Sequence, residues 1–289
     1  MELHDLTLRE GDQMPDRSYD ADAKVEAALA LDRLGIAGIQ AGFPATGETD
    51  RETIRRLDGR TDATVVGLAR AVERDIDKVA DAGADGVDVF TYLSERQLNH
   101  VVGKSREEML DATVAAVDYA RDCGLAVEVS LVDSFRTDLD VQVNALERLA
   151  DVPVVNLPDS VGATTPLTVA ERLDALGERV DLSRVGVHFH DDLGCAAANT
   201  LVAKERGVAK ADVAVASLGE RAGNTPLEQV VAGSTSDRGD DMGLNVGELI
   251  PACYDVLDAL GEEVDPRTPI LGVEPVTHES GIHTTAMLD

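Results

Sequence analysis

The sequence is poor in aromatic residues and cysteine, and it has no long hydrophobic run. It contains no tryptophan, four tyrosines and four phenylalanines among 289 residues. The cysteines, Cys123, Cys195 and Cys253, are odd in number and widely spaced, which excludes a disulfide framework or a zinc knuckle. No apolar run approaches the ~20 residues of a membrane helix, and residues 1–5 have no signal-peptide character. We therefore expect a cytoplasmic protein that does not act at a membrane.

Positive charge is also scarce. Asp and Glu number 55 against 26 Lys and Arg, giving a net charge of −29. This excludes sequence-neutral nucleic-acid binding, because phosphate contacts need clustered cations. The balance is typical of proteins from a halophilic cytoplasm, where molar salt with a Debye length of ~3 Å screens repulsion between carboxylates. An acidic protein of a mesophile is the alternative, and either way the charge indicates habitat and solubility rather than chemistry.

Hydrophobic patterning predicts an α/β fold. Short apolar runs alternate with stretches that repeat apolar residues at helical spacing, which indicates a parallel sheet. The expected strands are 4–8, 38–41, 64–68, 86–90, 126–131, 152–156, 185–189 and 212–216, and the expected helices include 21–34, 74–82, 105–123, 138–149, 166–176 and 196–206. Eight such units fit a (β/α)8 TIM barrel. A doubly wound sheet is the competitor, but no Gly-x-Gly-x-x-Gly follows the first strand.

Polar motifs follow two of the expected strands. His188 and His190 end the seventh strand, and residues i and i+2 of a strand share one face. Glu10 follows the first strand beside Arg9. In a barrel, catalytic side chains lie at the carboxyl ends of strands, and only the eighth strand separates the first from the seventh. We therefore expect Glu10, His188 and His190 to form a two-histidine, one-carboxylate site for a divalent cation.

Two further positions are weaker candidates. Asn224 ends a glycine-rich segment, 219–224, and its amide oxygen would complete the metal shell, although ordinary helix entry explains the glycines equally well. Ser160, after the sixth strand, is placed to hydrogen-bond a substrate carboxylate or carbonyl, and its alternative role is a turn and N-cap.

Seven motifs along the chain resemble those of the 2-isopropylmalate synthase and homocitrate synthase family, which also includes citramalate synthase and 3-hydroxy-3-methylglutaryl-CoA lyase. In order, the motifs are LREGDQ (8–13), QAGFP (40–44), GKSREE (103–108), PDSVG (158–162), HFHDDLG (188–194), GERAGN (219–224) and HESGIH (278–283). The resemblance implies a Claisen condensation of acetyl-CoA with a 2-oxo acid, followed by thioester hydrolysis. It also implies a catalytic barrel over 1–235, with 236–289 as the truncated start of a helical subdomain.

The resemblance also assigns residue roles. It implies that the Mg²⁺, Mn²⁺ or Zn²⁺ ion is held by Glu10, His188, His190 and Asn224. The implied catalytic residues are Arg9, which would steady the oxyanion, and His283, which in this family typically reaches the site of a neighbouring subunit. The implied substrate-binding residues are Gln13, Arg136 and Ser160. A homodimer follows from the role of His283.

Several positions depart from the family pattern. Val132 occupies the place of a glutamate usually counted as catalytic. Either His283 or a water held by Glu220 takes over its role, or the reaction differs. Glu10 and 134–136 are more like homocitrate synthase, whereas 41–44 and 278–283 favour isopropylmalate or citramalate synthase. The best prediction is a 2-isopropylmalate synthase-like enzyme of leucine biosynthesis, with homocitrate or citramalate synthase as alternatives. A metal-dependent hydroxyacyl-CoA or aldol lyase, or a catalytically impaired metal-binding barrel, are hypotheses of other classes.

Overall fold

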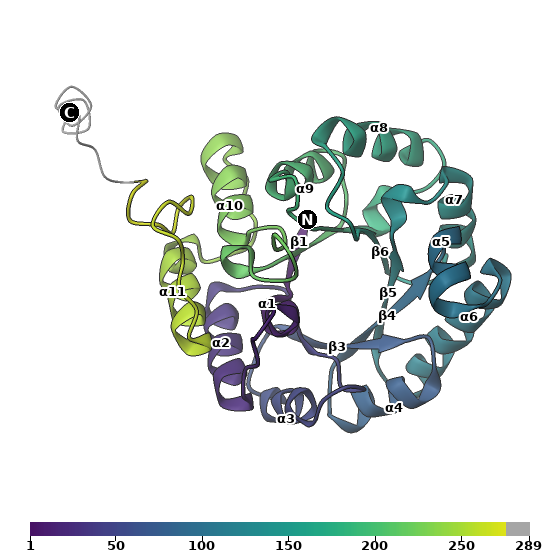
Figure 1. The fold of residues 1–289 in the computed structure, drawn as a ribbon, viewed down its shortest axis with the longest axis horizontal. Coiled ribbons are helices and arrows are strands. Elements are labelled where there is room, and N and C mark those ends of the chain that lie inside the picture. The colour runs from purple at the N-terminus through teal and green to yellow at the C-terminus, as the bar shows by residue number, and fades with distance from the viewer. Residues whose placement is uncertain (276–289) are drawn as a thin grey trace.

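The computed structural model describes residues 1–275, and its centre is a closed barrel of eight parallel strands. Neighbouring strands along the chain pair with one another, and β8 closes the ring against β1 (Figure 1). The strands are β1 (Glu2–Asp5), β2 (Gly38–Gly42), β3 (Thr64–Arg70), β4 (Gly86–Tyr92), β5 (Ala126–Val132), β6 (Val154–Asp159), β7 (Val185–Phe189) and β8 (Lys210–Val213). The predicted (β/α)8 architecture is therefore confirmed.

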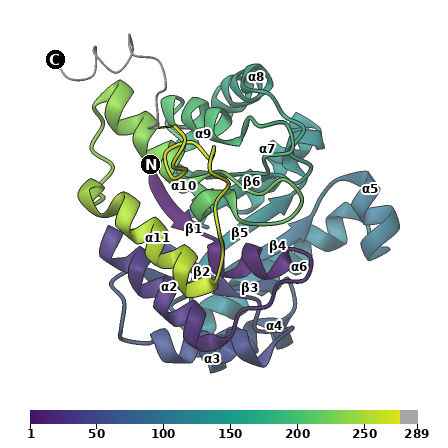
Figure 2. The same cartoon turned by 60° about the vertical axis from the view of Figure 1, so that its left-hand side comes forward.

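The helices lie mostly around the outside of the ring, and the first, short one lies at its mouth (Figure 1). They are α1 (Thr7–Glu10), α2 (Ala21–Leu34), α3 (Glu48–Leu57), α4 (Glu73–Asp81), α5 (Glu95–Gln97), α6 (Arg106–Asp122), α7 (Leu139–Arg148), α8 (Pro166–Gly177), α9 (Ala196–Glu205), α10 (Leu227–Ala232) and α11 (Leu249–Leu260). Helix α11 packs against α2 on the outside of the barrel (Figure 2). Within residues 1–275, no helix has the length and apolar character needed to cross a bilayer.

Several strands present apolar residues to the helices and polar residues to the barrel interior. In β4, Val87 and Val89 belong to the hydrophobic core, whereas Asp88 between them bonds to neighbours on other strands. In β5, Val127 and Val129 alternate in the same way with inward polar residues. Because TIM-barrel interiors are usually filled by branched apolar side chains, this polar interior is a departure that bears on function.

Helix α2 illustrates how local sequence sets an element. The Asp20 side chain accepts a hydrogen bond from the Ala23 N–H at 2.9 Å, which caps the first turn. The helix ends at Gly35, whose φ of 88° lies in the left-handed region that favours glycine. Both boundaries match the prediction.

Several elements differ from the prediction, and three of them illustrate why. The first strand ends at Asp5 rather than residue 8, because the Asp5 carboxylate accepts bonds from the Thr7 N–H (2.8 Å) and hydroxyl (3.0 Å), which turns the chain into α1. The eighth strand ends at Val213, and Ala216 beyond it has a φ of 50°. Helix α3, which was not predicted, is strongly polar and buries only Thr53, Ile54 and Leu57.

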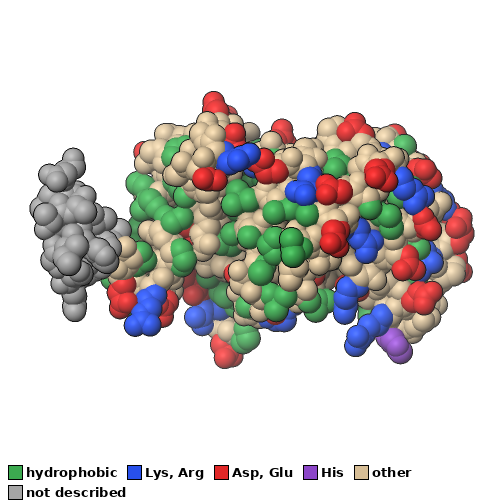
Figure 3. All heavy atoms as spheres, turned by 90° about the horizontal axis from the view of Figure 1, so that it is seen from above, with side chains coloured by type: hydrophobic (Ala, Val, Ile, Leu, Met, Phe, Trp, Pro, Cys, Tyr) green, Lys and Arg blue, Asp and Glu red, His purple; other side chains and the backbone are tan. Residues whose placement is uncertain are grey.

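Charged side chains of both signs are interspersed on the face of the molecule shown in Figure 3. Arginines are repeatedly shared between carboxylates: Arg148, for example, contacts Glu107 at 2.7 Å and also Asp111. Such exposed pairs each contribute little to stability, but they distribute the scarce positive charge among the excess of acidic groups. The predicted domain limit after residue 235 falls in the segment Gly233–Asp237 that follows α10.

Candidate metal centre

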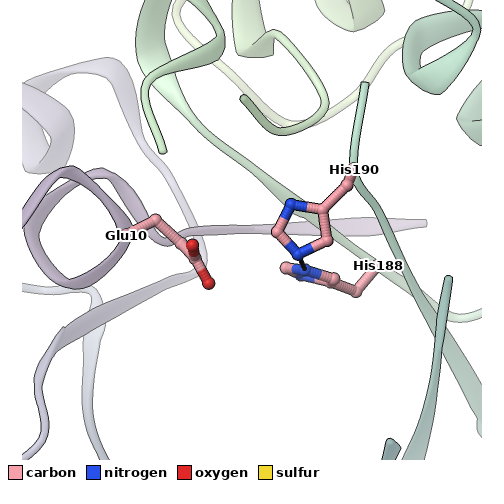
Figure 4. A group of neighbouring side chains, drawn as sticks. All are labelled: Glu10, His188 and His190. Atoms are coloured by element: carbon pink, nitrogen blue, oxygen red, sulfur yellow. Dashed lines mark hydrogen bonds between the residues drawn. The ribbon is translucent and has the colours of Figure 1, made fainter. Parts of the chain in front are cut away.

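Glu10, His188 and His190 meet at the barrel mouth. One potential ligand atom from each lies within 4.8 Å of the others, and all three side chains are buried. The two imidazole Nε2 atoms are 3.3 Å apart, and the carboxylate points toward them from the other side (Figure 4). Glu10 is the last residue of α1, His188 belongs to β7, and His190 directly follows β7. The arrangement has the ligand types and the convergence of a facial two-histidine, one-carboxylate site.

The short helix α1 places Glu10. It follows the turn made by Asp5 and Thr7, and the Thr7 hydroxyl also accepts from the Val215 N–H at 2.9 Å, which ties α1 to the segment after β8. Arg9, on the same helix, donates to the Glu10 carboxylate and to the Gln40 side chain of β2, the latter at 2.6 Å. The arginine therefore fixes the carboxylate from one side and leaves its second oxygen facing the histidines.

Strand β7 places the histidines. His188 and His190 face the interior, while Phe189 packs outward against Phe135 with ring centroids 5.3 Å apart. The Nδ1 atom of His188 lies 3.4 Å from the Asp212 carboxylate of β8. A carboxylate on Nδ1 sets the tautomer that directs the Nε2 lone pair toward an ion. Lys210 lies 3.1 Å from the same carboxylate and balances its charge.

Asn224 lies beside His190, with which it forms an isolated antiparallel bridge. Its side-chain nitrogen donates to the Leu218 carbonyl at 3.0 Å. A Cβ at Gly219, whose φ is 145°, would lie 1.9 Å from that nitrogen, so the close approach requires glycine there. The amide oxygen of Asn224 takes no part in the hydrogen bond to Leu218.

The local electrostatics keep the ligands in their metal-binding forms. Burial alone would raise the pKa of Glu10, but the charges of Arg9 and the histidines outweigh it and hold the pKa below its usual value. Burial, with His188 beside it, lowers the pKa of His190 to about 4. A carboxylate and a neutral imidazole, both able to donate electron pairs, are therefore present at neutral pH.

Several buried polar atoms of the cluster lack a partner. In the described part of the chain, neither Glu10 Oε2 nor Asn224 Oδ1 accepts a hydrogen bond, although both are buried. Such atoms are costly unless a ligand satisfies them. A carboxylate and two imidazoles whose ligand atoms lie within 4.8 Å of one another suit a divalent cation such as Mg²⁺, Mn²⁺ or Zn²⁺, so the residues fit the predicted ion.

The cluster forms one side of a cavity of about 310 Å³. Its lining residues are Arg9, Glu10, Gln13, Phe43, Leu68, Asp88, Phe90, Tyr92, Ser130, Val132, Pro158, Ser160, His188, His190, Asp212 and Glu220. Gln13 and Ser160, predicted to bind substrate, both line it. The Gln13 side chain accepts from Arg9 at 3.3 Å, and the Ser160 hydroxyl accepts from the Asp133 N–H at 2.9 Å. The Ser160 hydroxyl proton is thus free to be donated.

Arg136, predicted to bind substrate, does not line this cavity. Arg136 lines a separate surface cavity, and its guanidinium makes a two-point contact with Asp133 at 2.7 and 2.9 Å. In the sequence, only the spacing of three residues between Asp133 and Arg136 indicates this pairing. His283 and the motif 278–283 lie outside the described residues. Val132 lines the cavity and presents an apolar side chain at the position where the family pattern has a glutamate.

Sequence reasoning missed two acidic residues of the cavity. Asp88 is buried in β4 and reaches the cavity floor, and Asp212 of β8 supports His188. Each was only a single acidic residue within an expected strand. The available signal was their position: each stands between two valine or alanine residues that belong to the core, so each must face inward.

Comparison with known proteins adds independent findings. The family model described as HMGL-like matches residues 1–255. The chain is 38% identical to a probable 2-isopropylmalate synthase of Methanopyrus kandleri, and the match covers 99% of this chain and 58% of that protein. It is also 38% identical to a homocitrate synthase of the same organism, where the match covers 99% of this chain and 73% of that protein. The chain therefore spans little more than half the length of the first of these relatives.

A solved structure shares the fold. The crystal structure of hydroxymethylglutaryl-CoA lyase from Pseudomonas aeruginosa superposes with a TM-score of 0.81 at 22% identity, covering 92% of this chain and 95% of that one. At this level of identity the likeness concerns the barrel architecture alone.

Proposed function

The chain belongs to the HMGL-like family, and on that premise we propose that it condenses acetyl-CoA with a 2-oxo acid and releases CoA by hydrolysis of the thioester. The observation that carries the proposal is the convergence of Glu10, His188 and His190 on one side of a cavity that is large enough for a small acid. The identity to synthases over 99% of the chain supports the same activity.

We propose that the cation is held by Glu10, His188 and His190, with the Asn224 amide oxygen as a fourth ligand. The buried oxygens of Glu10 and Asn224 without partners support this set. When bound there, a divalent cation would act as a Lewis acid that makes the carbonyl carbon of a 2-oxo acid more electrophilic.

Arg9 supplies permanent positive charge at the cavity wall. Its guanidinium is anchored through Gln40 and Glu10 and lines the cavity. Carbon–carbon bond formation turns the carbonyl oxygen of the acid into an oxyanion, and a fixed cation beside it lowers the barrier. The free hydroxyl proton of Ser160, across the cavity, is placed to bind a carboxylate or carbonyl oxygen of the acid.

The removal of a proton from the acetyl methyl group needs a base, and Val132 cannot provide one. Glu220, half-buried at the cavity wall and 3.4 Å from the Arg221 guanidinium, is placed to hold a water for this step. His283 stays a predicted alternative, together with the homodimer in which it would act. Size-exclusion chromatography with light scattering tests the dimer.

The test of the proposed function is release of free CoA. Purified protein is incubated with acetyl-CoA, one 2-oxo acid at a time and Mg²⁺ or Mn²⁺ in molar KCl, and the new thiol is titrated. We expect release that requires both the acid and the metal. Cleavage of a hydroxyacyl-CoA without added acid would instead identify a lyase. Metal binding with no release from any acid would leave a non-catalytic barrel.

A further inference from the structure

Helix α10 buries a carboxyl group that the proposed chemistry does not use. Glu228 is completely buried, on a helix whose Leu227 and Val230 belong to the hydrophobic core. Its Oε2 atom accepts a hydrogen bond from the Ala216 N–H at 3.1 Å, and its Oε1 atom accepts none from residues 1–275. A carboxyl group in apolar surroundings is costly. The packing of α10 therefore does not by itself account for a glutamate at this position.

The partner of Glu228 lies in a strained segment of the chain. Ala216 and Ser217, which follow β8, have φ values of 50° and 61°. Two successive left-handed residues are costly when both carry a Cβ, and they persist only where their surroundings hold them. The N–H of the preceding residue, Val215, donates to the Thr7 hydroxyl at 2.9 Å. Two consecutive backbone N–H groups are thus held by side chains from two helices, α10 and α1.

This segment in turn fixes Asn224. The Asn224 N–H donates to the Ser217 carbonyl at 3.1 Å, and the Ser217 hydroxyl donates to the Asn224 carbonyl at 2.5 Å. The side-chain nitrogen of Asn224 donates to the carbonyl of Leu218, the next residue, at 3.0 Å. The backbone and the side chain of Asn224 are therefore both held by residues whose position depends on the left-handed conformation of Ala216 and Ser217.

The surroundings of Glu228 call for a hydrogen-bond acceptor more than for a charge. Burial raises the pKa of Glu228 to about 7, and hydrogen bonds from backbone N–H groups oppose the rise. The buried groups near it include the Asp5 carboxyl and the Cys253 thiol, neither of which supplies positive charge. A neutral side chain with an oxygen at the same place should therefore hold the Ala216 N–H as well as a carboxylate does.

We propose that Glu228 is a positioning residue: by accepting the hydrogen bond of the Ala216 N–H, it holds the left-handed segment that places the Asn224 amide oxygen at the metal centre. The inference rests on the proposed ligand set, in which Asn224 is the fourth ligand, and names what determines the position of that ligand. Glu228 is not among the residues that line the cavity. An effect of its substitution on the metal therefore has to pass through the chain between residues 216 and 224.

The test is calorimetric titration of Mn²⁺ into the metal-free protein at pH 8 without substrates, in molar KCl, which screens weak binding to surface carboxylates. Glu228→Met removes the acceptor, and Glu228→Asp keeps the charge but withdraws the carboxyl group by one carbon. In both variants the dissociation constant should rise by about tenfold or more, as is typical when the support of a ligand is lost. Glu228→Gln keeps an oxygen at the right distance and should stay within about threefold of wild type. Glu171→Met, at an exposed position of α8, should bind Mn²⁺ like wild type.

Two further comparisons separate positioning from a general loss of structure. Adding Ala216→Gly to Glu228→Met should recover about threefold of the lost affinity, because glycine adopts a φ of 50° without steric cost. Ala214→Gly, at an extended position just before the segment, should recover none. In the Asn224→Ala background, Glu228→Met should cause no further loss of affinity, since the effects of two residues that act through one ligand do not add.

The outcomes separate the two proposals. A wild-type dissociation constant in Glu228→Met, with a raised constant in Asn224→Ala, would overturn the role of Glu228 and leave the ligand set standing. Additive losses in the double variant would overturn that role too. A wild-type constant in Asn224→Ala would remove Asn224 from the ligand set and overturn both proposals. If Glu228→Met does not fold, as judged by circular dichroism, the comparison of Glu228→Asp with Glu228→Gln decides the question. Because no substrate is present, the result is independent of the condensation.

Discussion

The two sides of the barrel mouth carry different chemistry. On the β7, β8 and β1 side, Glu10, His188 and His190 gather polar atoms around one point. On the β3 to β5 side, Phe90 is flanked by Phe43 and Tyr92, each with ring centroids 5.9 Å away and nearly perpendicular. The first side is suited to hold a reacting group, and the second to select what is attached to it. Changes on the first side should therefore affect turnover, and changes on the second should affect selectivity.

The largest effect is expected from His190→Ala. It removes one of the two imidazoles whose Nε2 atoms lie 3.3 Å apart. Metal-dependent CoA release should therefore be abolished, and the affinity for Mn²⁺ should fall. The matched control is His100→Ala, which changes an exposed histidine far along the chain and should leave both measurements unaltered. Full activity in His190→Ala would show that the ligand set is wrong.

Arg9→Gln should have the next largest effect. The substitution keeps a polar side chain beside Gln40 but removes the fixed charge next to the developing oxyanion. Loss of one such group typically costs about 10²–10³-fold in kcat. Steady-state kinetics should show this loss in kcat, with a smaller change in the KM of the acid. Arg55→Gln on the exposed face of α3 serves as the control, and a change confined to KM would contradict the proposed role.

The sequence predicted the first side well because its residues form local patterns. A histidine pair spaced by two on a buried strand must share one face, and the barrel topology brings Glu10 to it across β8. The missed details are short-range geometry: α1 exists because Asp5 folds back onto Thr7, which apolar periodicity does not reveal.

The second side was not predicted, for a physical reason. Its lining residues come from different strands, and none of them forms a recognisable motif by itself. Asp88 is a single acidic residue between valines. The pKa of its carboxyl group depends on Lys210 and Glu128, which lie far from it in sequence. Arg136 was assigned to the acid pocket, yet Asp133 holds it in a neighbouring cavity. Helix α3 was missed because it is mostly polar and buries only a few residues, so it has no clear apolar periodicity.

A third prediction concerns the support beneath the metal cluster. Asp212→Asn removes the charge that lies 3.4 Å from His188 Nδ1 and weakens control over the tautomer. Loss of such a partner usually costs about 10–100-fold in metal affinity, so the Mn²⁺ dissociation constant, measured by calorimetry, should rise by this factor. Asp140→Asn, at an exposed position on α7, should not change it. Unchanged affinity in Asp212→Asn would show that His188 is oriented by the backbone alone.

The smallest effect is expected on the selecting side, from Phe90→Leu. The change removes two edge-on aromatic contacts, each worth about 0.5–1.5 kcal/mol, and enlarges the cavity without touching a charged group. We expect the KM of the preferred acid to rise by less than about tenfold, with kcat and Mn²⁺ affinity close to wild type. A kcat loss as large as that of Arg9→Gln would mean that the wall also positions the reacting atoms. The division between a side that holds and a side that selects would then have to be abandoned, because both functions would depend on the same residues.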